Sequence, residues 1–229
     1  MIKQIPFLID KLFYRHHLNS NRQKTGIPRM LTKLKERIQS VLAAEAETVH
    51  RIGLTPNMLS GIGLVLAFLS ALAYTTWRVT PFYLLLAAVL FLFSGFCDAL
   101  DGIVARLCDK TTNFGGFLDS LLDRYADVVV YSGIIIGGLC DLIWGLAAII
   151  GSFLVSYSRA RAEAAGVEME SIGIAERAER MIILALASAV ATFWRPQMVM
   201  NAGIFLLAVL SNLTVLQRSL HVYKKLKRQ

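Results

Sequence analysis

Four aspartates occur in two closely spaced pairs, Asp98 with Asp101 and Asp119 with Asp123, within otherwise apolar stretches. On a helix that turns by about 100° per residue, spacings of three and four residues place both members of a pair on one face. Two helices can then present four carboxylates to one point. Such a cluster repels itself strongly at low dielectric and persists only when protons or cations neutralise it. Because hard divalent ions prefer oxygen ligands, the pattern predicts a Mg²⁺ or Mn²⁺ site.

Small residues continue the stripe of the first pair. Gly102 and Ala105 follow Asp98 by four and seven residues, on the same helical face. Almost no side chain covers the backbone there, so a flat ligand can lie against it. Carboxylates beside bare backbone predict a site for a nucleotide and metal ions.

The complete motif resembles the signature of the CDP-alcohol phosphotransferase family. The matching positions, at fixed spacing, are Asp98, Asp101, Gly102, Ala105, Arg106, Gly115, Asp119 and Asp123. The resemblance implies an all-α, polytopic membrane enzyme with six transmembrane helices, acting as a homodimer. It also implies two divalent ions, Mg²⁺ or Mn²⁺, held mainly by Asp98, Asp101 and Asp119. Asp123 is the expected general base and a further metal contact.

The family resemblance implies transfer of a lipid-phosphate group from a CDP-lipid donor to an alcohol, with release of CMP. Beside the metal-binding aspartates, the candidate donor-binding residues are Gly102, Ala105, Arg106, Asn57 and Thr112. Asn57 fits an ordinary helix-start residue equally well, and Thr112 an ordinary loop or cap residue. A purely structural alternative for the acids is pairing with Arg106 and Arg124, but pairing alone would not require this spacing. Asp127 falls outside the signature and is expected to form a structural ion pair with an arginine.

A second resemblance concerns the acceptor. Residues 156–164, SYSRARAEA, and 173–180, GIAERAER, are similar to the branch that makes phosphatidylinositol phosphate or archaetidylinositol phosphate. The resemblance implies that inositol 1-phosphate is bound through its phosphate by Arg159, Arg177 and Arg218, the last matched only by approximate position. Glycerol 3-phosphate and serine remain alternative acceptors. The arginines could instead mark the membrane boundary, with Glu176 and Arg180 forming an i,i+4 pair.

Composition assigns the chain to the membrane proteins. Of 229 residues, 55% are hydrophobic and 17% charged, and the mean hydropathy of +0.55 is outside the usual soluble range. The net charge of +8 does not indicate nucleic acid, because the basic residues flank apolar segments, as cytoplasmic loops near anionic lipid do. Cys97, Cys108 and Cys140 form no disulfide or zinc motif.

Apolar segments divide the chain into predicted spans that place the acids at one membrane surface. They are residues 57–77, 79–97, 128–140, 142–158, 181–194 and 197–217. A loop over 107–116 is expected to join the two acidic helices. This arrangement leaves Arg78 and Arg195 as the only basic residues on the outer side. The positive-inside rule then places the active site and both termini on the cytoplasmic side of the cell membrane.

The domain organisation is simple. Residues 1–29 read as a basic tail and residues 30–229 as one membrane domain. From Leu31 onward, apolar residues recur at helical spacing between lysines, which predicts an amphipathic helix lying in the cytoplasmic interface.

An ion-coupled transporter is the alternative from another class, because carboxylates inside membranes also mark ion pathways. Transporters tend to place them near the bilayer midplane within inverted repeats. In this chain the acids lie at the inner ends of the predicted spans, which favours the enzyme.

Overall fold

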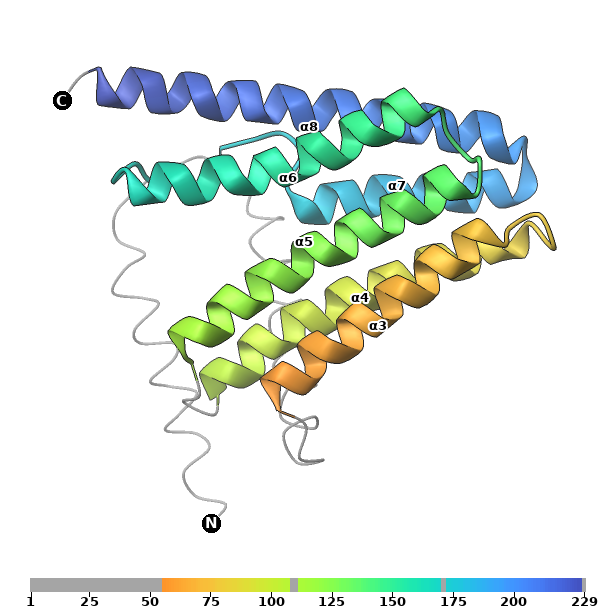
Figure 1. Cartoon of the computed structure of the whole chain (residues 1–229), viewed down its shortest axis with the longest axis horizontal. Helices are drawn as coiled ribbons and strands as arrows, with labels where there is room; N and C mark the ends of the chain where they lie inside the picture. The colour runs from red at the N-terminus through yellow and green to blue at the C-terminus, as the bar shows by residue number, and fades with distance from the viewer. Residues whose placement is uncertain (1–54, 108–110, 170–171, 228–229) are drawn as a thin grey trace, which may run out of the picture. The chain divides into compact units, whose positions relative to one another are not determined.

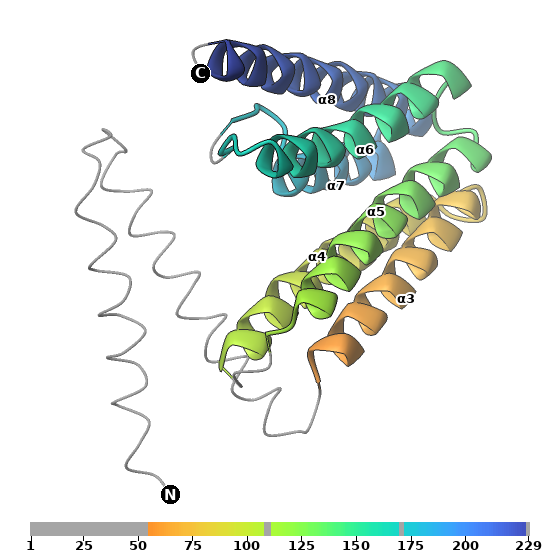
Figure 2. The same ribbon diagram turned by 60° about the vertical axis from the view of Figure 1, so that its left-hand side comes forward.

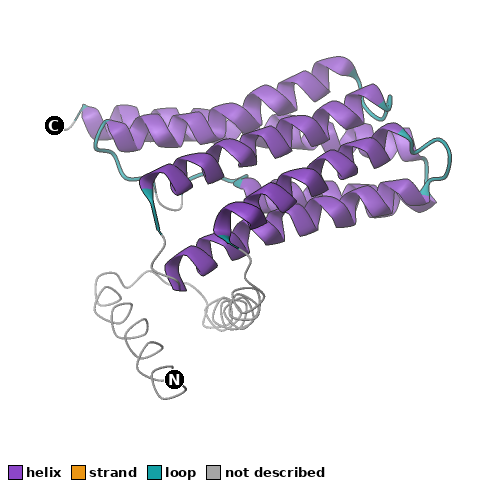
Figure 3. Cartoon of the chain, turned by 60° about the horizontal axis from the view of Figure 1, so that its bottom comes forward, coloured by secondary structure: helices purple, strands orange, loops and turns teal. Residues whose placement is uncertain are grey.

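The computed structural model describes residues 55–107, 111–169 and 172–227, which form helices and no strand (Figures 1 and 3). The helices in this part of the chain are α3 (Pro56–Thr75), α4 (Phe82–Leu107), α5 (Asn113–Ile136), α6 (Leu142–Ala164), α7 (Arg177–Phe193) and α8 (Pro196–Leu226). The all-α class predicted from the sequence is confirmed for these residues. The predicted tail and interfacial helix, up to residue 54, lie outside the described residues.

Local sequence determines where several helices begin. Thr55 caps α3 by accepting a hydrogen bond from the Met58 backbone N–H at 3.3 Å, and Pro56 occupies the first turn, where its missing N–H costs little. Thr112 caps α5 in the same way, at 2.9 Å from the Gly115 nitrogen. The loop predicted over residues 107–116 therefore extends too far at its C-terminal end. Gly115 already lies in the first turn of α5.

The helices pack in two groups (Figures 1 and 2). In the first, α3 packs along both α4 and α5; in the second, α8 packs along both α6 and α7. The main contact between the groups is made by α4 with α7, and a smaller one by α5 with α6. The acids of α4 and α5 are therefore brought together mainly through α3, which touches both helices extensively.

Glycines allow α3 and α5 to touch directly. A Cβ atom built on Gly133 would come within 2.6 Å of the Ala71 carbonyl oxygen, and one on Gly137 within 2.5 Å of the Tyr74 carbonyl oxygen. No larger residue fits at either position without moving the neighbouring backbone. Beside this contact, the Tyr74 hydroxyl lies 2.7 Å from the Ser188 hydroxyl of α7.

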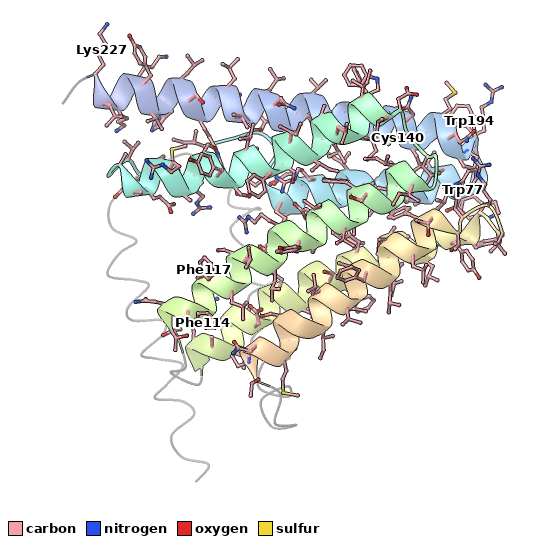
Figure 4. All side chains as sticks on the ribbon, in the orientation of Figure 1. Trp77, Phe114, Phe117, Cys140, Trp194 and Lys227 are labelled. Atoms are coloured by element: carbon pink, nitrogen blue, oxygen red, sulfur yellow. The ribbon has the colours of Figure 1, made fainter. Side chains whose placement is uncertain are left out.

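Three helix-connecting turns meet at one end of the bundle. Figure 4 shows Trp77, Cys140 and Trp194 together at this end, with Phe117 and Lys227 towards the other. Trp77 donates its indole N–H to the Gly137 carbonyl at 2.8 Å. Asn201 exchanges two hydrogen bonds with Asp141, each 2.9 Å long. The chain therefore passes back and forth between the two ends, as the predicted spans require.

Four helices, α3, α4, α6 and α8, are long and apolar enough to cross a membrane. At 20 residues, α3 is about 30 Å long, the thickness of a bilayer core. α5 carries Asp119, Asp123 and Arg124 in its first half and Asp127 just past its middle, and α7 has 17 residues. The prediction of a membrane protein with several apolar spans is confirmed, with four helices rather than six long and apolar enough in the described part of the chain. Many large apolar side chains on the outer faces, such as Val65, Phe93 and Ile143, are exposed, as lipid contact requires.

Candidate active site

Three of the predicted metal ligands lie together. Asp98 of α4 and both Asp119 and Asp123 of α5 each offer one carboxylate oxygen, and these oxygens lie within 4.8 Å of one another. The spacing of Asp119 and Asp123 places both on the α5 face that meets α4. This group of three residues is called the carboxylate cluster below. Its side chains line a narrow pocket together with Ser60, Gly63, Ser94 and Arg177.

Asp101, the fourth predicted ligand, lies beside the carboxylate cluster and has its own partner. Its side chain is buried, with 4% of the residue exposed, and it accepts a hydrogen bond from the Ser60 hydroxyl of α3. Sequence reasoning missed Ser60, although it follows Asn57 by three residues and so shares its helical face. Ser60 thus fixes the orientation of Asp101 from a third helix.

Arg177, at the start of α7, reaches directly into the carboxylate cluster. Its Nη1 atom lies 2.8 Å from Asp98 Oδ2 and also donates to Asp123 Oδ1. Its Nε atom lies 3.4 Å from Asp127 Oδ1. From the sequence, this arginine was expected to contact a phosphate on the acceptor, and its contact with the predicted metal ligands Asp98 and Asp123 was not foreseen.

Asp127 forms the structural ion pair predicted from the sequence. Only 7% of the residue is exposed. Its Oδ2 atom accepts hydrogen bonds from Arg180 Nη2 at 2.8 Å and from the Ser152 hydroxyl at 2.9 Å. The alternative i,i+4 pair between Glu176 and Arg180 is wrong, because Asp127 takes the Arg180 guanidinium. Asp127 therefore joins α5, α6 and α7 beside the carboxylate cluster.

Arg218 of α8 holds the connection between α6 and α7. Its guanidinium, 2% exposed, donates through Nε to the Ile172 carbonyl at 2.8 Å and through Nη1 to the Val155 carbonyl. Its Nη2 atom lies 3.3 Å from Glu176 Oε1. Glu176 directly precedes Arg177, so Arg218 fixes the point from which Arg177 enters the site.

Gly173 and Thr214 tighten the same connection. Gly173 has φ +136°, a conformation that favours glycine, and a Cβ atom there would lie 2.6 Å from the Thr214 methyl group. The Thr214 hydroxyl accepts a hydrogen bond from the Ala175 N–H at 3.1 Å. Side chains of α8 thus hold residues 172–176 against the bundle.

Arg159 of α6 is the most exposed of the three predicted acceptor-binding arginines. Its Nε atom lies 2.9 Å from Glu163 Oε1, in an i,i+4 pair. Arg159 follows Val155 by one helical turn, and Val155 accepts a bond from Arg218. The three predicted arginines consequently border one region, in which Arg177 alone is shown in contact with the carboxylate cluster.

The predicted nucleotide-contacting residues lie at one end of α4 and at the starts of α3 and α5. A Cβ atom on Gly102 would meet the Arg106 Nη2 atom at 4.0 Å and nothing closer, so the backbone there is open to a ligand. Arg106, Asn57 and Thr112 are exposed, and Ala105 is partly exposed. Asn57 lies in the first turn of α3, and Thr112 caps α5. These positions match the helix-start role and the cap role that the sequence left open for the two residues.

Charge in the site is unevenly balanced. The carboxylate cluster brings three carboxyl groups together with Asp101 beside them, and in the described part of the chain Arg177 and Arg124 are the guanidinium groups that contact the cluster. Arg124 touches Asp123 from the edge, at 3.3 Å. The donor set is all oxygen and its charge is not fully neutralised, so it fits hard divalent cations.

A family model for CDP-alcohol phosphatidyltransferases matches residues 53–215. The chain belongs to this family. Archaetidylinositol phosphate synthase of Pyrococcus horikoshii is 39% identical over 204 residues, covering 86% of this chain and 99% of the relative. The synthase of the same name from Methanothermobacter thermautotrophicus is 42% identical over 177 residues, covering 77% and 87%.

Solved structures of phosphatidylinositol phosphate synthase from Mycobacterium tuberculosis are also similar. One with CDP-DAG bound has a TM-score of 0.66 and 31% identity, covering 80% of this chain and 94% of that one. One in complex with manganese and citrate has a TM-score of 0.66 and 32% identity, covering 80% and 88%.

Family membership makes this protein a multi-pass membrane transferase of phospholipid biosynthesis and sets the transporter alternative aside. The matched segment contains the whole aspartate motif, Arg159 and Arg177, whereas Arg218 lies three residues beyond its end.

Proposed function

We propose that this transferase moves the lipid-phosphate group of a CDP-lipid to a hydroxyl of inositol 1-phosphate and releases CMP. The observation that carries the proposal is the contact of Arg177 with Asp98 and Asp123, because it puts a phosphate-binding group beside the expected base. The names of the relatives described above support the same acceptor.

The donor end is assigned to the first three helices. Asp98, Asp101 and Asp119 would hold Mg²⁺ or Mn²⁺, with Asp123 as an additional contact. When bound, the two divalent ions neutralise the diphosphate and stabilise the leaving CMP. The open backbone at Gly102 and Ala105 would receive the cytidine, and Arg106 can donate two hydrogen bonds to a phosphate. Asn57 and Thr112 are the outer candidates for nucleotide contact.

Asp123 takes the proton in the proposed reaction. The acceptor hydroxyl oxygen forms a bond to the lipid-bearing phosphorus, while the bond from that phosphorus to the CMP oxygen breaks. The hydroxyl proton passes to a carboxylate oxygen of Asp123, which restores neutrality at the attacking oxygen as the bond forms. CMP leaves with the electron pair of the broken bond.

The acceptor end is assigned to the last three helices. Arg177 and Arg159 would contact the phosphate of inositol 1-phosphate, and Arg218 borders the same region through Val155 and Glu176. A phosphate dianion gains charge-assisted bonds from several guanidinium groups, which a neutral acceptor does not. Glycerol 3-phosphate would satisfy the same arginines and is the second candidate acceptor.

A panel of acceptors tests the proposal. Purified enzyme in detergent receives CDP-archaeol or CDP-diacylglycerol with inositol 1-phosphate, free inositol, glycerol 3-phosphate or serine. We expect inositol 1-phosphate to be used best and free inositol poorly. The higher identity to the archaetidylinositol phosphate synthases supports CDP-archaeol as the better donor. Equal use of inositol and inositol 1-phosphate at low concentration would refute the phosphate-binding role.

We also propose the finer topology, in which α5 and α7 complete six spans and the site faces the cytoplasm together with both termini. The return of the chain at each connection and the basic residues near the site support it. A helix beginning near Leu31 would lie in the cytoplasmic interface, and two chains would form a homodimer. Labelling of single cysteines from either side tests the topology, and mass measurement in detergent tests the dimer.

A further inference from the structure

Arg177 contacts two of the carboxyl groups that a divalent cation would need. One of its nitrogens, Nη1, donates to Asp98 and to Asp123. The same two carboxyl groups belong to the carboxylate cluster, whose oxygens lie within 4.8 Å of one another. A metal ion and the guanidinium would need oxygens of the same two carboxyl groups, and their positive charges repel each other strongly at low dielectric. The two cations are therefore competitors.

The other side of the Arg177 guanidinium is held separately. Its Nε atom lies 3.4 Å from Asp127, which is not part of the carboxylate cluster. Asp127 is itself fixed by Arg180 and Ser152 at 2.8 and 2.9 Å. Arg177 thus has one end anchored at a buried carboxylate and one end that can be exchanged.

We infer that Arg177 is a built-in counter-ion that a divalent metal displaces from Asp98 and Asp123. The displaced Nη1 atom, on a side chain still held at Asp127 through Nε, becomes available to an anion. The identity of that anion as the acceptor phosphate rests on the proposed function; the displacement itself does not. Because binding free energies are linked, metal and acceptor phosphate must then favour each other's binding.

Manganese binding to the full-length protein, measured by electron paramagnetic resonance without any substrate, tests the displacement. Arg177→Gln removes the competitor, so we expect its Kd for Mn²⁺ to fall by at least about fivefold, the lower end of usual coupling between sites. Arg159→Gln is the matched control, because it removes the same charge from an arginine that pairs with Glu163. The control should bind Mn²⁺ as the wild type does. An unchanged or higher Kd for Arg177→Gln would overturn the inference.

The wild-type protein provides a second measurement that does not depend on the folding of a variant. The Arg177 side chain is 19% exposed while it contacts the carboxylates. Displacement should expose it further, so the rate at which phenylglyoxal modifies Arg177, followed by mass spectrometry, should rise when Mn²⁺ replaces chelator. An equal or lower rate with Mn²⁺ would contradict the displacement.

These outcomes are separable from those of the acceptor panel. If another acceptor proves best, the proposed function fails while a tighter Mn²⁺ site in Arg177→Gln still supports the displacement. If inositol 1-phosphate is the best acceptor but Mn²⁺ affinity is unaffected by Arg177→Gln, only the displacement fails.

Discussion

The helices that supply acids and the helices that supply arginines position their side chains by different means. Asp98, Asp119 and Asp123 come from the interior of regular helices, so helical spacing alone decides which face they share. Arg177 follows the connection over 165–176, and its place depends on what holds that connection. Arg218 does so from α8. The half of the site proposed to bind metal is thus encoded locally, and the half proposed to bind phosphate is encoded by contacts between distant segments.

The largest effect is expected for Asp123, the proposed base. Asp123→Asn should lower kcat by about 10²- to 10⁴-fold, because the amide cannot take the proton. Binding of CDP-lipid should persist, since Asp98, Asp101 and Asp119 remain. Asp98→Asn is the matched comparison and should instead weaken donor binding that depends on Mg²⁺ or Mn²⁺. Titration of CDP-lipid with metal and with chelator separates the two, and full turnover in excess chelator would refute the metal assignment.

Asp127 lies between the two halves, so its replacement should affect stability as well as activity. Asp127→Asn leaves the buried Arg180 guanidinium without its carboxylate partner. Removing one member of a buried ion pair costs about 3–5 kcal/mol, so the free energy of unfolding should fall by that amount. Equilibrium unfolding in mixed micelles measures it. Ser152→Ala removes a hydrogen bond from a neutral hydroxyl to the same carboxylate oxygen and should cost less, about 1.5–3 kcal/mol. Equal losses would show that charge is not what matters at Asp127.

On the arginine side, Arg177→Gln should act on the acceptor. Losing charge-assisted bonds worth about 1.5–3 kcal/mol raises the KM for inositol 1-phosphate by about 10- to 100-fold. The KM for CDP-lipid should change little, because the proposed donor-binding residues, the aspartates and Arg106, are unchanged. Steady-state kinetics with each substrate varied in turn checks this split. A parallel rise in both constants would mean that the two halves do not divide the substrates between them.

The smallest effect is expected outside both halves. Deleting residues 1–29 should leave turnover within about twofold, because this segment precedes the family match at residue 53 and contributes nothing to the aspartate motif. The truncated protein is compared with the full chain after equal membrane insertion is verified. Loss of most activity would assign the tail a role in one of the halves.

The same contrast explains what sequence reasoning could and could not predict. Helix class, most helix positions and the convergence of Asp98 with Asp119 and Asp123 followed from periodicity and spacing. The pairing of Asp127 with an arginine was also predicted, because a buried charge needs a partner. The bond between Ser60 and Asp101 joins residues 41 positions apart, and no periodic pattern reports such a contact. The insertion of Arg177 among the acids depends on the connection held by α8, which spacing does not determine.

Arg218 has a consequence for how the protein tolerates mutation. Two of its three contacts are with main-chain carbonyl oxygens, those of Ile172 and Val155, which every amino acid provides. Substitutions at positions 155 and 172 can therefore change the side chain without removing the hydrogen bonds that hold the α6–α7 connection. Position 218 has no such freedom, since lysine has a single nitrogen and cannot reach both carbonyls and Glu176 in one geometry. In a saturation mutagenesis experiment we expect 155 and 172 to accept many apolar residues, while 218 accepts arginine alone.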